Sequence, residues 1–156
     1  MVALACYSRR ARGWLYSPSV SAAFGIAATD STRYGTGAAG TAVGNACLVA
    51  KQVLASDQGT RFIQIDFGSW DHHQDIYGAQ NANGNNIVTM GTQLDNALGA
   101  LFDDLKSSGL FDQTLVVVVG EFGRTPGGVT GNLGRAHYII QSAMLAGGGI
   151  QGGKVK

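Results

Sequence analysis

TLVVVVGEFGRTP, residues 114–126, joins a run of aliphatic side chains to a short polar motif. The run Leu115–Val119 is mostly β-branched, is too short for an ordinary helix and is followed by a glycine, a pattern typical of a strand buried on both faces of a parallel sheet. Glu121, Gly123 and Arg124 come directly after it. Open α/β sheets bind ligands just beyond the carboxyl ends of their strands. The motif therefore predicts one side of a binding site.

A second strand is predicted over Arg61–Phe67, where apolar and polar residues alternate before the chain reaches Trp70-Asp71-His72-His73. Between the two strands, an apolar stripe with helical spacing predicts a helix over Ile87–Leu105, ended by Ser107-Ser108-Gly109. A helix that joins two parallel strands makes a right-handed βαβ crossover. The expected fold class is therefore α/β, with a mostly parallel sheet and flanking helices.

The remaining patterns divide the chain into two parts. Residues 1–35 are poorly patterned, with a marginal helix around Ser19–Ala28, and are expected to pack against a larger body formed by residues 36–156. Within this body, apolar residues at helical spacing predict a helix from Gly40 to Ala55. A further short strand is predicted over Ser142–Ala146.

Composition excludes several classes of protein. With 156 residues the chain has the length of one domain, and a net charge of +1 offers no electrostatic reason to bind nucleic acid. No apolar run reaches the 18 residues of a membrane span, and no secretory signal peptide is visible. Two cysteines are too few for a disulfide framework, so a buried thiol at Cys47 is favoured over a bridge to Cys6.

Carboxylates and imidazoles follow the two predicted strands. Asp71 and His73 are two residues apart, so both can point the same way from an extended loop. Glu121 ends the neighbouring strand, and His137 follows a glycine-rich loop that can fold back over it. These four predict a site for one or two divalent metals, with Zn, Mn and Ca left open. Arg124 is predicted to clamp a tetrahedral oxyanion with its planar guanidinium.

Two other interpretations stay open at this point. The acid–arginine motif can be a salt bridge that braces a turn without any ligand, and His72 can simply be solvated. Residues 35–40 match the G-x-G-x-x-G pattern of dinucleotide-binding loops, but that fingerprint needs a hydrophobic strand before its first glycine. The preceding Thr29–Tyr34 is polar instead.

The motifs taken together resemble the DUF1501 family of the alkaline phosphatase/sulfatase-like superfamily. The resemblance covers residues 33–156 and rests on DFGSWDHH (66–73), LDNALGALFDDL (94–105), TLVVVVGEFGRTP (114–126), GRAHY (134–138) and LAGGGIQGGKV (145–155). It implies an α/β sandwich around a large, mostly parallel sheet, and a metal-dependent hydrolase of phosphate or sulfate esters, acting on small molecules or glycans. Family habit also implies a bacterial exported or periplasmic location.

The resemblance assigns roles residue by residue. Asp71 and His73 match the acid and imidazole of a W-D-T-H motif, Glu121 and Arg124 match E-F-G-R, and His137 matches the histidine of G-x-D-H. The acid of that last motif is Ala136 here, and His72 stands where threonine is common. Nothing in residues 1–34 matches the superfamily's nucleophile region, so the nucleophile is unknown. We expect a partial alkaline-phosphatase-like domain, incomplete as a catalyst; a non-catalytic binding or structural remnant is the alternative.

Overall fold

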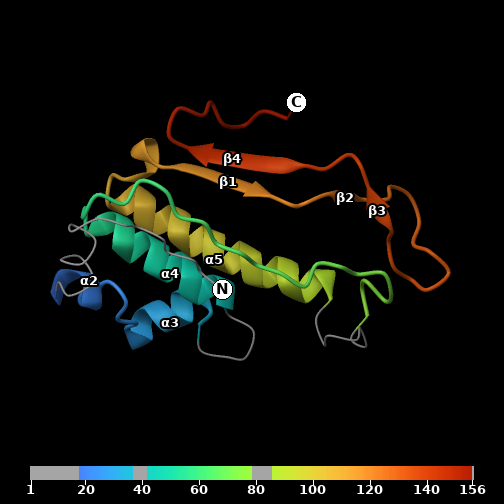
Figure 1. The fold of residues 1–156 in the computed structure, drawn as a ribbon, viewed down its shortest axis with the longest axis horizontal. Helices are drawn as coiled ribbons and strands as arrows, with labels where there is room; N and C mark the ends of the chain where they lie inside the picture. Colours follow the sequence, from blue (N-terminus) through green and yellow to red (C-terminus); the bar gives the residue numbers. More distant parts are fainter. Residues whose placement is uncertain (1–17, 37–41, 79–85, 156) are drawn as a thin grey trace, which may run out of the picture.

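The computed structural model describes residues 18–36, 42–78 and 86–155 (Figure 1). Its helices and strands follow one another as α2 (Pro18–Ala22), α3 (Ala28–Tyr34), α4 (Ala42–Ala55), α5 (Ile87–Ser107), the 3-10 turn η1 (Phe111–Gln113), β1 (Leu115–Val119), β2 (Gly123–Arg124), β3 (His137–Tyr138) and β4 (Ala143–Gly147). Figure 1 shows β1 and β4 running along one side of α5, with α4 and α3 on its other side. The small β2–β3 pair lies near the N-terminal end of α5.

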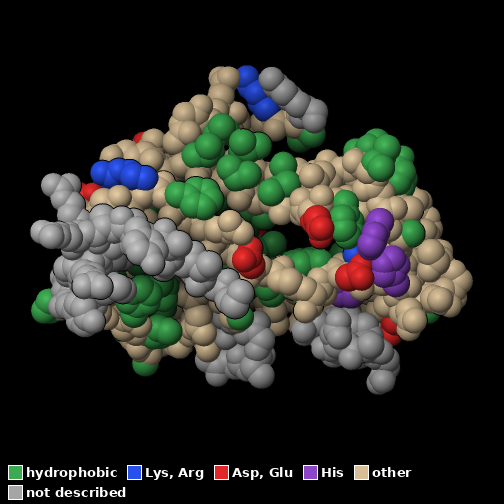
Figure 2. Space-filling model, in the orientation of Figure 1, with side chains coloured by type: hydrophobic (Ala, Val, Ile, Leu, Met, Phe, Trp, Pro, Cys, Tyr) green, Lys and Arg blue, Asp and Glu red, His purple; other side chains and the backbone are tan. Residues whose placement is uncertain are grey.

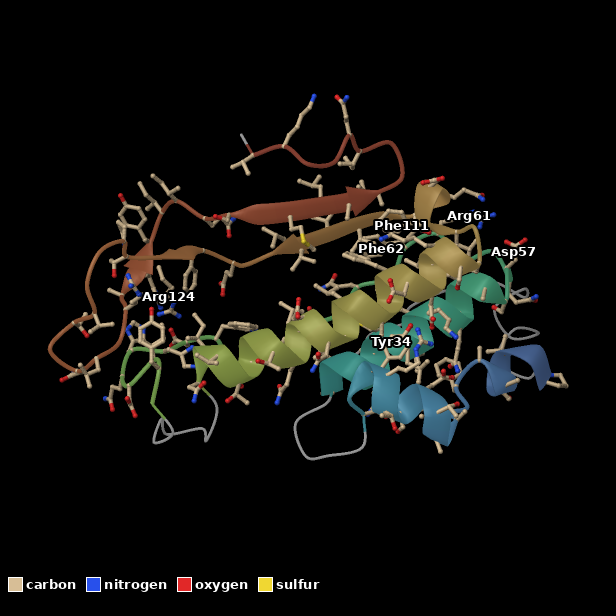
Figure 3. All side chains as sticks on the ribbon, turned by 180° about the vertical axis from the view of Figure 1, so that it is seen from behind. Tyr34, Asp57, Arg61, Phe62, Phe111 and Arg124 are labelled. Atoms are coloured by element: carbon tan, nitrogen blue, oxygen red, sulfur yellow. The ribbon has the colours of Figure 1, made fainter. Side chains whose placement is uncertain are left out.

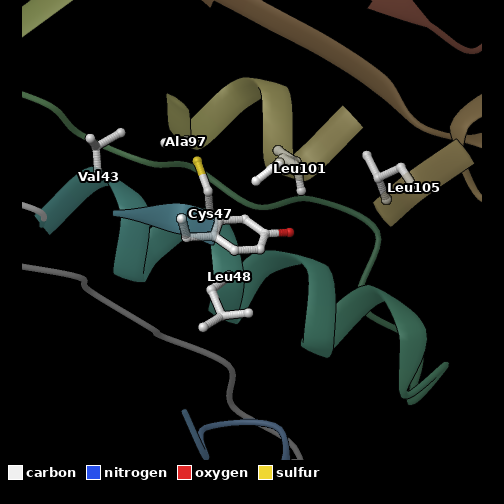
Figure 4. Close-up of a cluster of buried hydrophobic side chains, with 8 residues drawn as sticks. Val43, Cys47, Leu48, Ala97, Leu101 and Leu105 are labelled. Atoms are coloured by element: carbon white, nitrogen blue, oxygen red, sulfur yellow. The ribbon is translucent and has the colours of Figure 1, made fainter. Parts of the chain in front are cut away.

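The helix predictions for α4 and α5 are confirmed. Helix α5 begins after Asn86, whose side chain accepts a hydrogen bond from the backbone N–H of Thr89 at 2.9 Å, and a glycine with positive φ, Gly109, follows its last turn. The apolar faces of α4 and α5 pack together with a tyrosine from α3 (Figure 4). This core consists of Tyr34, Val43, Cys47, Leu48, Ala97, Ala100, Leu101 and Leu105.

Cys47 is a free, buried thiol, as predicted, and burial raises its pKa to about 11. Its predicted alternative partner, Cys6, lies outside the described residues. The marginal helix expected around Ser19–Ala28 is replaced by two helices, α2 and α3, with a turn between them. No helix in the described part of the chain is long and apolar enough to cross a membrane.

A partly buried carboxylate links the three helices. Asp104 on α5 accepts hydrogen bonds from the Arg33 guanidinium at 2.6 Å and from the Tyr34 hydroxyl at 2.9 Å, both on α3. Lys51 on α4 lies 3.4 Å from the same carboxylate. Burial alone would raise the pKa of Asp104, but these hydrogen bonds and charges lower it below its ordinary value. Gly44 lets α3 and α4 approach closely, because a Cβ there would lie 2.1 Å from the Tyr34 carbonyl oxygen.

The prediction of a mostly parallel sheet is wrong. The described residues form two separate two-stranded antiparallel sheets, β1–β4 and β2–β3. Both expected strands at Leu115–Val119 and near Ser142–Ala146 form, but they run in opposite directions. An apolar run identifies a strand without showing the direction of its partner. The α/β sandwich of an alkaline-phosphatase-like domain is therefore not the fold of this chain.

Strand β1 is also not buried on both faces. Val116 packs against the helical core, while Leu115, Val117 and Val119 on the opposite face are each more than half exposed. Leu145, directly opposite Val117 on β4, is equally exposed. The aliphatic run predicted a covering layer on each face of the strand. Among the described elements, the helical core covers the face that carries Val116, and the other face is exposed.

The prediction of a strand over Arg61–Phe67 is wrong as well. The segment is extended, and Ile65 and Phe67 pack against the core while Phe62 is 80 % exposed (Figure 3). No backbone hydrogen bond joins it to any other described element. The alternation of apolar and polar residues indicates which side chains face inward. A strand in a sheet also needs a partner strand for its backbone N–H and C=O groups. Without this strand, α5 makes no βαβ crossover.

The dinucleotide interpretation lacks its required strand. Residues 28–34, which precede the first glycine, form helix α3 rather than a hydrophobic strand. Residues 37–40 of the motif lie outside the described part of the chain.

We predict that Asp104→Asn lowers the free energy of unfolding at pH 7 by about 1–3 kcal/mol, because hydrogen bonds to a charged group carry this much. Urea unfolding followed by circular dichroism measures the change. The neighbouring Asp103→Asn, on the exposed side of α5, is the control and should change stability by less than about 0.5 kcal/mol. An equal loss in both variants would contradict the role of Asp104.

The same pair of proteins tests the electrostatic cause. The folded state holds the pKa of Asp104 below that of the unfolded chain, so its stabilising effect is present above about pH 4 and is lost as the pH falls through the folded value. The stability difference between wild type and Asp104→Asn should therefore shrink as the pH is lowered from 5 toward 2.

Candidate metal centre

Backbone hydrogen bonds join two loops that are far apart in the sequence. Gln74 and Leu133 form an isolated antiparallel bridge, the Arg135 N–H donates to the His72 carbonyl at 3.0 Å, and the Ile76 N–H donates to the Leu133 carbonyl at 2.9 Å. Ile76 is fully buried, and its own carbonyl accepts from the first residue of α5 at 3.0 Å. The W-D-H-H loop is thereby fixed both to the G-R-A-H-Y loop and to the helical body.

The E-F-G-R motif joins the same loops through the β2–β3 pair. Gly123 lies opposite Tyr138, and Arg124 lies opposite His137. Glycine is required at position 123 because a Cβ there would lie 1.7 Å from the Ile140 carbonyl oxygen. All three sequence motifs thus meet at one end of the molecule.

Three predicted metal ligands converge on one point there. The Nε2 atoms of His73 and His137 each lie 3.0 Å from Oδ1 of Asp71, and 3.1 Å from each other. Figure 2 shows the histidine side chains gathered beside acidic ones near the β2–β3 end. The three side chains are 48–63 % exposed, so the space beside them is open to a small molecule.

Arg124 fastens this cluster to its surroundings (Figure 3). Its Nη2 donates to the Asp71 carboxylate and to the Trp70 carbonyl, the latter at 3.2 Å, and its Nη1 donates to the Arg135 carbonyl at 2.9 Å. The hydrogen bond from Arg124, followed by the one from His137, lowers the pKa of Asp71 to about 2. Asp71 is therefore ionised at neutral pH, as a metal ligand must be.

The other predicted site residues are not among the three converging ligands. Glu121 is exposed in the turn after β1 and is not part of the described group of Asp71, His73 and His137. His72 is buried rather than solvated, with its Nδ1 3.1 Å from the Trp70 carbonyl oxygen. The Arg124 guanidinium donates to three protein acceptors, and its role as an oxyanion clamp stays a prediction.

Sequence reasoning missed two supporting residues. The Phe122 ring lies 4.1 Å from the His137 ring and 5.4 Å from the Arg124 guanidinium, measured to its centroid. Gly134 packs directly on the backbone of His73, where a Cβ would lie 2.0 Å from the carbonyl carbon. Both residues lie inside the quoted motifs but offer no ligand atom. The sequence indicates a role for them only through their position beside residues that do offer one.

Backbone strain surrounds the cluster. Among the described non-glycine residues, four have positive φ, and three of them flank the ligands: Ser69 at 74°, Asp75 at 42° and Leu133 at 59°. A bulky residue such as leucine rarely adopts this conformation. Such strain persists only where the surroundings impose the conformation, and it concentrates at functional sites. The loop conformation is therefore held by the pairing described above.

The sequence matches the family model described as "Protein of unknown function (DUF1501)" over residues 3–156. The chain therefore belongs to the DUF1501 family. No curated protein and no solved structure matches it significantly.

We predict that Gly134→Ala destabilises the protein by about 2 kcal/mol or more, because the new methyl group would overlap the backbone of His73. Urea unfolding measures the loss. Gly131→Ala in the same loop is the control, since nothing lies within 4 Å of a Cβ at that position. Equal stability of the two variants would show that the loops are not packed as described.

Proposed function

We propose that the chain binds one divalent metal ion through Asp71, His73 and His137. The observation that carries this proposal is the convergence of three ligand atoms, one carboxylate oxygen and two imidazole nitrogens, within 3.1 Å of one another. Asp71 Oδ1 can accept a hydrogen bond from each imidazole, and the same three atoms also lie close enough together to coordinate one ion. A cation at their common point would satisfy all three.

The donor set fits some metals better than others. Two imidazoles and one carboxylate, with the remaining side open, form the three-ligand arrangement of catalytic zinc sites. Manganese accepts the same ligands. Calcium takes six to eight oxygen ligands, and this cluster offers a single carboxylate. Zinc or manganese is therefore favoured within the predicted set of Zn, Mn and Ca.

We infer a hydrolase of phosphate or sulfate esters from the resemblance of the motifs to the alkaline phosphatase/sulfatase-like superfamily. A bound divalent metal would polarise an ester oxygen or activate water. Asp71 is held ionised by Arg124, and the Phe122 ring packs against His137 beside Asp71. The exposed side of the cluster leaves room for an ester group. No nucleophile is assigned.

A structural metal is the second candidate. Its support is that Asp71 and His73 come from one loop and His137 from the other, and that backbone hydrogen bonds already pair these loops. A metal there would cross-link the loops without any substrate.

We predict that plasma mass spectrometry finds about one metal ion per purified wild-type chain and less than about a tenth of that in His137→Ala. Loss of a residue that only supports a ligand typically lowers metal affinity by 10–100-fold, and loss of one of three ligands should lower it by far more. Asp103→Asn, which removes an acid on the exposed side of α5, is the control and should retain the metal. Glu121→Gln tests the fourth predicted ligand and is expected to retain metal too. Metal-free, folded wild-type protein would refute the site.

A second measurement separates the two candidate functions. Zinc at 100 times its dissociation constant should stabilise the folded chain by about 2.7 kcal/mol through binding alone, seen as a higher melting temperature. For an ester hydrolase, the loaded chain also releases p-nitrophenol from p-nitrophenyl phosphate or sulfate, and His73→Ala abolishes this release. Stabilisation without hydrolysis would favour a structural metal in this chain over a catalytic one.

A further inference from the structure

We propose that Arg124 is a positioning residue for the metal ligands, rather than a group that clamps substrate. This inference rests on the proposed metal site and assigns one more residue to it. Arg124 holds the carboxylate of Asp71 toward the two imidazoles and keeps the two ligand-bearing loops at their observed separation.

The hydrogen bonds of Arg124 reach both loops at once. Nη2 binds the Trp70 carbonyl and the Asp71 carboxylate on the first loop, and Nη1 binds the Arg135 carbonyl on the second. Asp71 is itself a ligand on the first loop, and Arg135 lies two residues before the ligand His137 on the second. One planar guanidinium therefore fixes the relative position of ligands 66 residues apart in the chain.

The guanidinium is itself held in place. Its side chain is only 19 % exposed, against 63 % for Asp71. The Phe122 ring contacts both this guanidinium and the His137 ring. Three of the five N–H donors of Arg124 are used by protein acceptors. Such a side chain is suited to orienting a ligand and poorly suited to swinging onto a substrate.

Lysine cannot replace it. An ammonium carries the same charge but lacks the planar fork that binds acceptors on two loops at once. A carboxylate whose supporting donor is lost reorients, and losing such an outer partner typically lowers metal affinity by 10–100-fold.

Arg135 is a matched control within the same hairpin. Its Nη1 donates to the Thr125 carbonyl at 2.5 Å, so it also braces the loop, but the described contacts of its guanidinium do not include Asp71 or the first loop. Loss of either arginine should weaken the hairpin. Only loss of Arg124 should disturb the ligands.

The test is isothermal titration of the full chain with Zn²⁺, combined with the visible absorption of the Co²⁺-loaded protein. Arg124→Lys and Arg124→Gln are expected to bind Zn²⁺ about 10–100-fold more weakly than wild type and to change the Co²⁺ spectrum. Arg135→Gln is expected to stay within about threefold of wild type with an unchanged spectrum, since removing an outlying brace leaves the ligand set intact. Urea unfolding shows that each variant titrated is folded.

Distinct outcomes separate the possible failures. No Zn²⁺ binding by wild type would refute the proposed metal site itself. Wild-type affinity in folded Arg124→Gln, tighter binding in it, or full recovery in Arg124→Lys would each overturn the positioning role while leaving the metal site in place. If neither Arg124 variant folds, Phe122→Leu carries the test: losing the ring beside the guanidinium should weaken Zn²⁺ binding about two- to fivefold, and unchanged affinity would overturn the role.

Discussion

The pairing of residues 72–76 with residues 132–135 is the contact on which the candidate site depends. Three backbone hydrogen bonds of 2.9–3.0 Å and one isolated bridge hold the two loops together. His73 and His137 are 64 positions apart in the chain, yet their ring nitrogens lie 3.1 Å apart because these loops are joined. Gly134 makes the pairing possible, since any side chain at that position would meet the backbone of His73.

The helical body fixes this pairing in space. Ile76 is buried and shares backbone hydrogen bonds with both the second loop and the start of α5. Helix α5 is in turn held to α3 and α4 by the apolar core and by the Asp104 carboxylate, which contacts Arg33, Tyr34 and Lys51. Helix α5 is therefore anchored to α3 and α4 near its C-terminal end, and it supports the loops of the candidate site at its N-terminal end.

Periodicity predicted much of the local structure. Helices α4 and α5 and strands β1 and β4 form close to where their apolar patterns predicted them. Each of these patterns depends on neighbours within a few residues of one another. The candidate metal ligands Asp71, His73 and His137 were predicted from residue type and spacing. The structure brings these three side chains together. Glu121 was predicted with them and lies outside the group.

What the sequence by itself determined is which segments become helices or strands and which side chains have metal-binding chemistry. Only the tertiary structure decided that β1 pairs with β4 in antiparallel fashion, that residues 61–67 stay unpaired among the described elements, and that Arg124 is directed at Asp71. The physical reason is that strand partners and side-chain acceptors are selected by contacts between residues distant in the chain. A local pattern shows that a group needs a partner, but the partner is chosen by the packing of the whole domain.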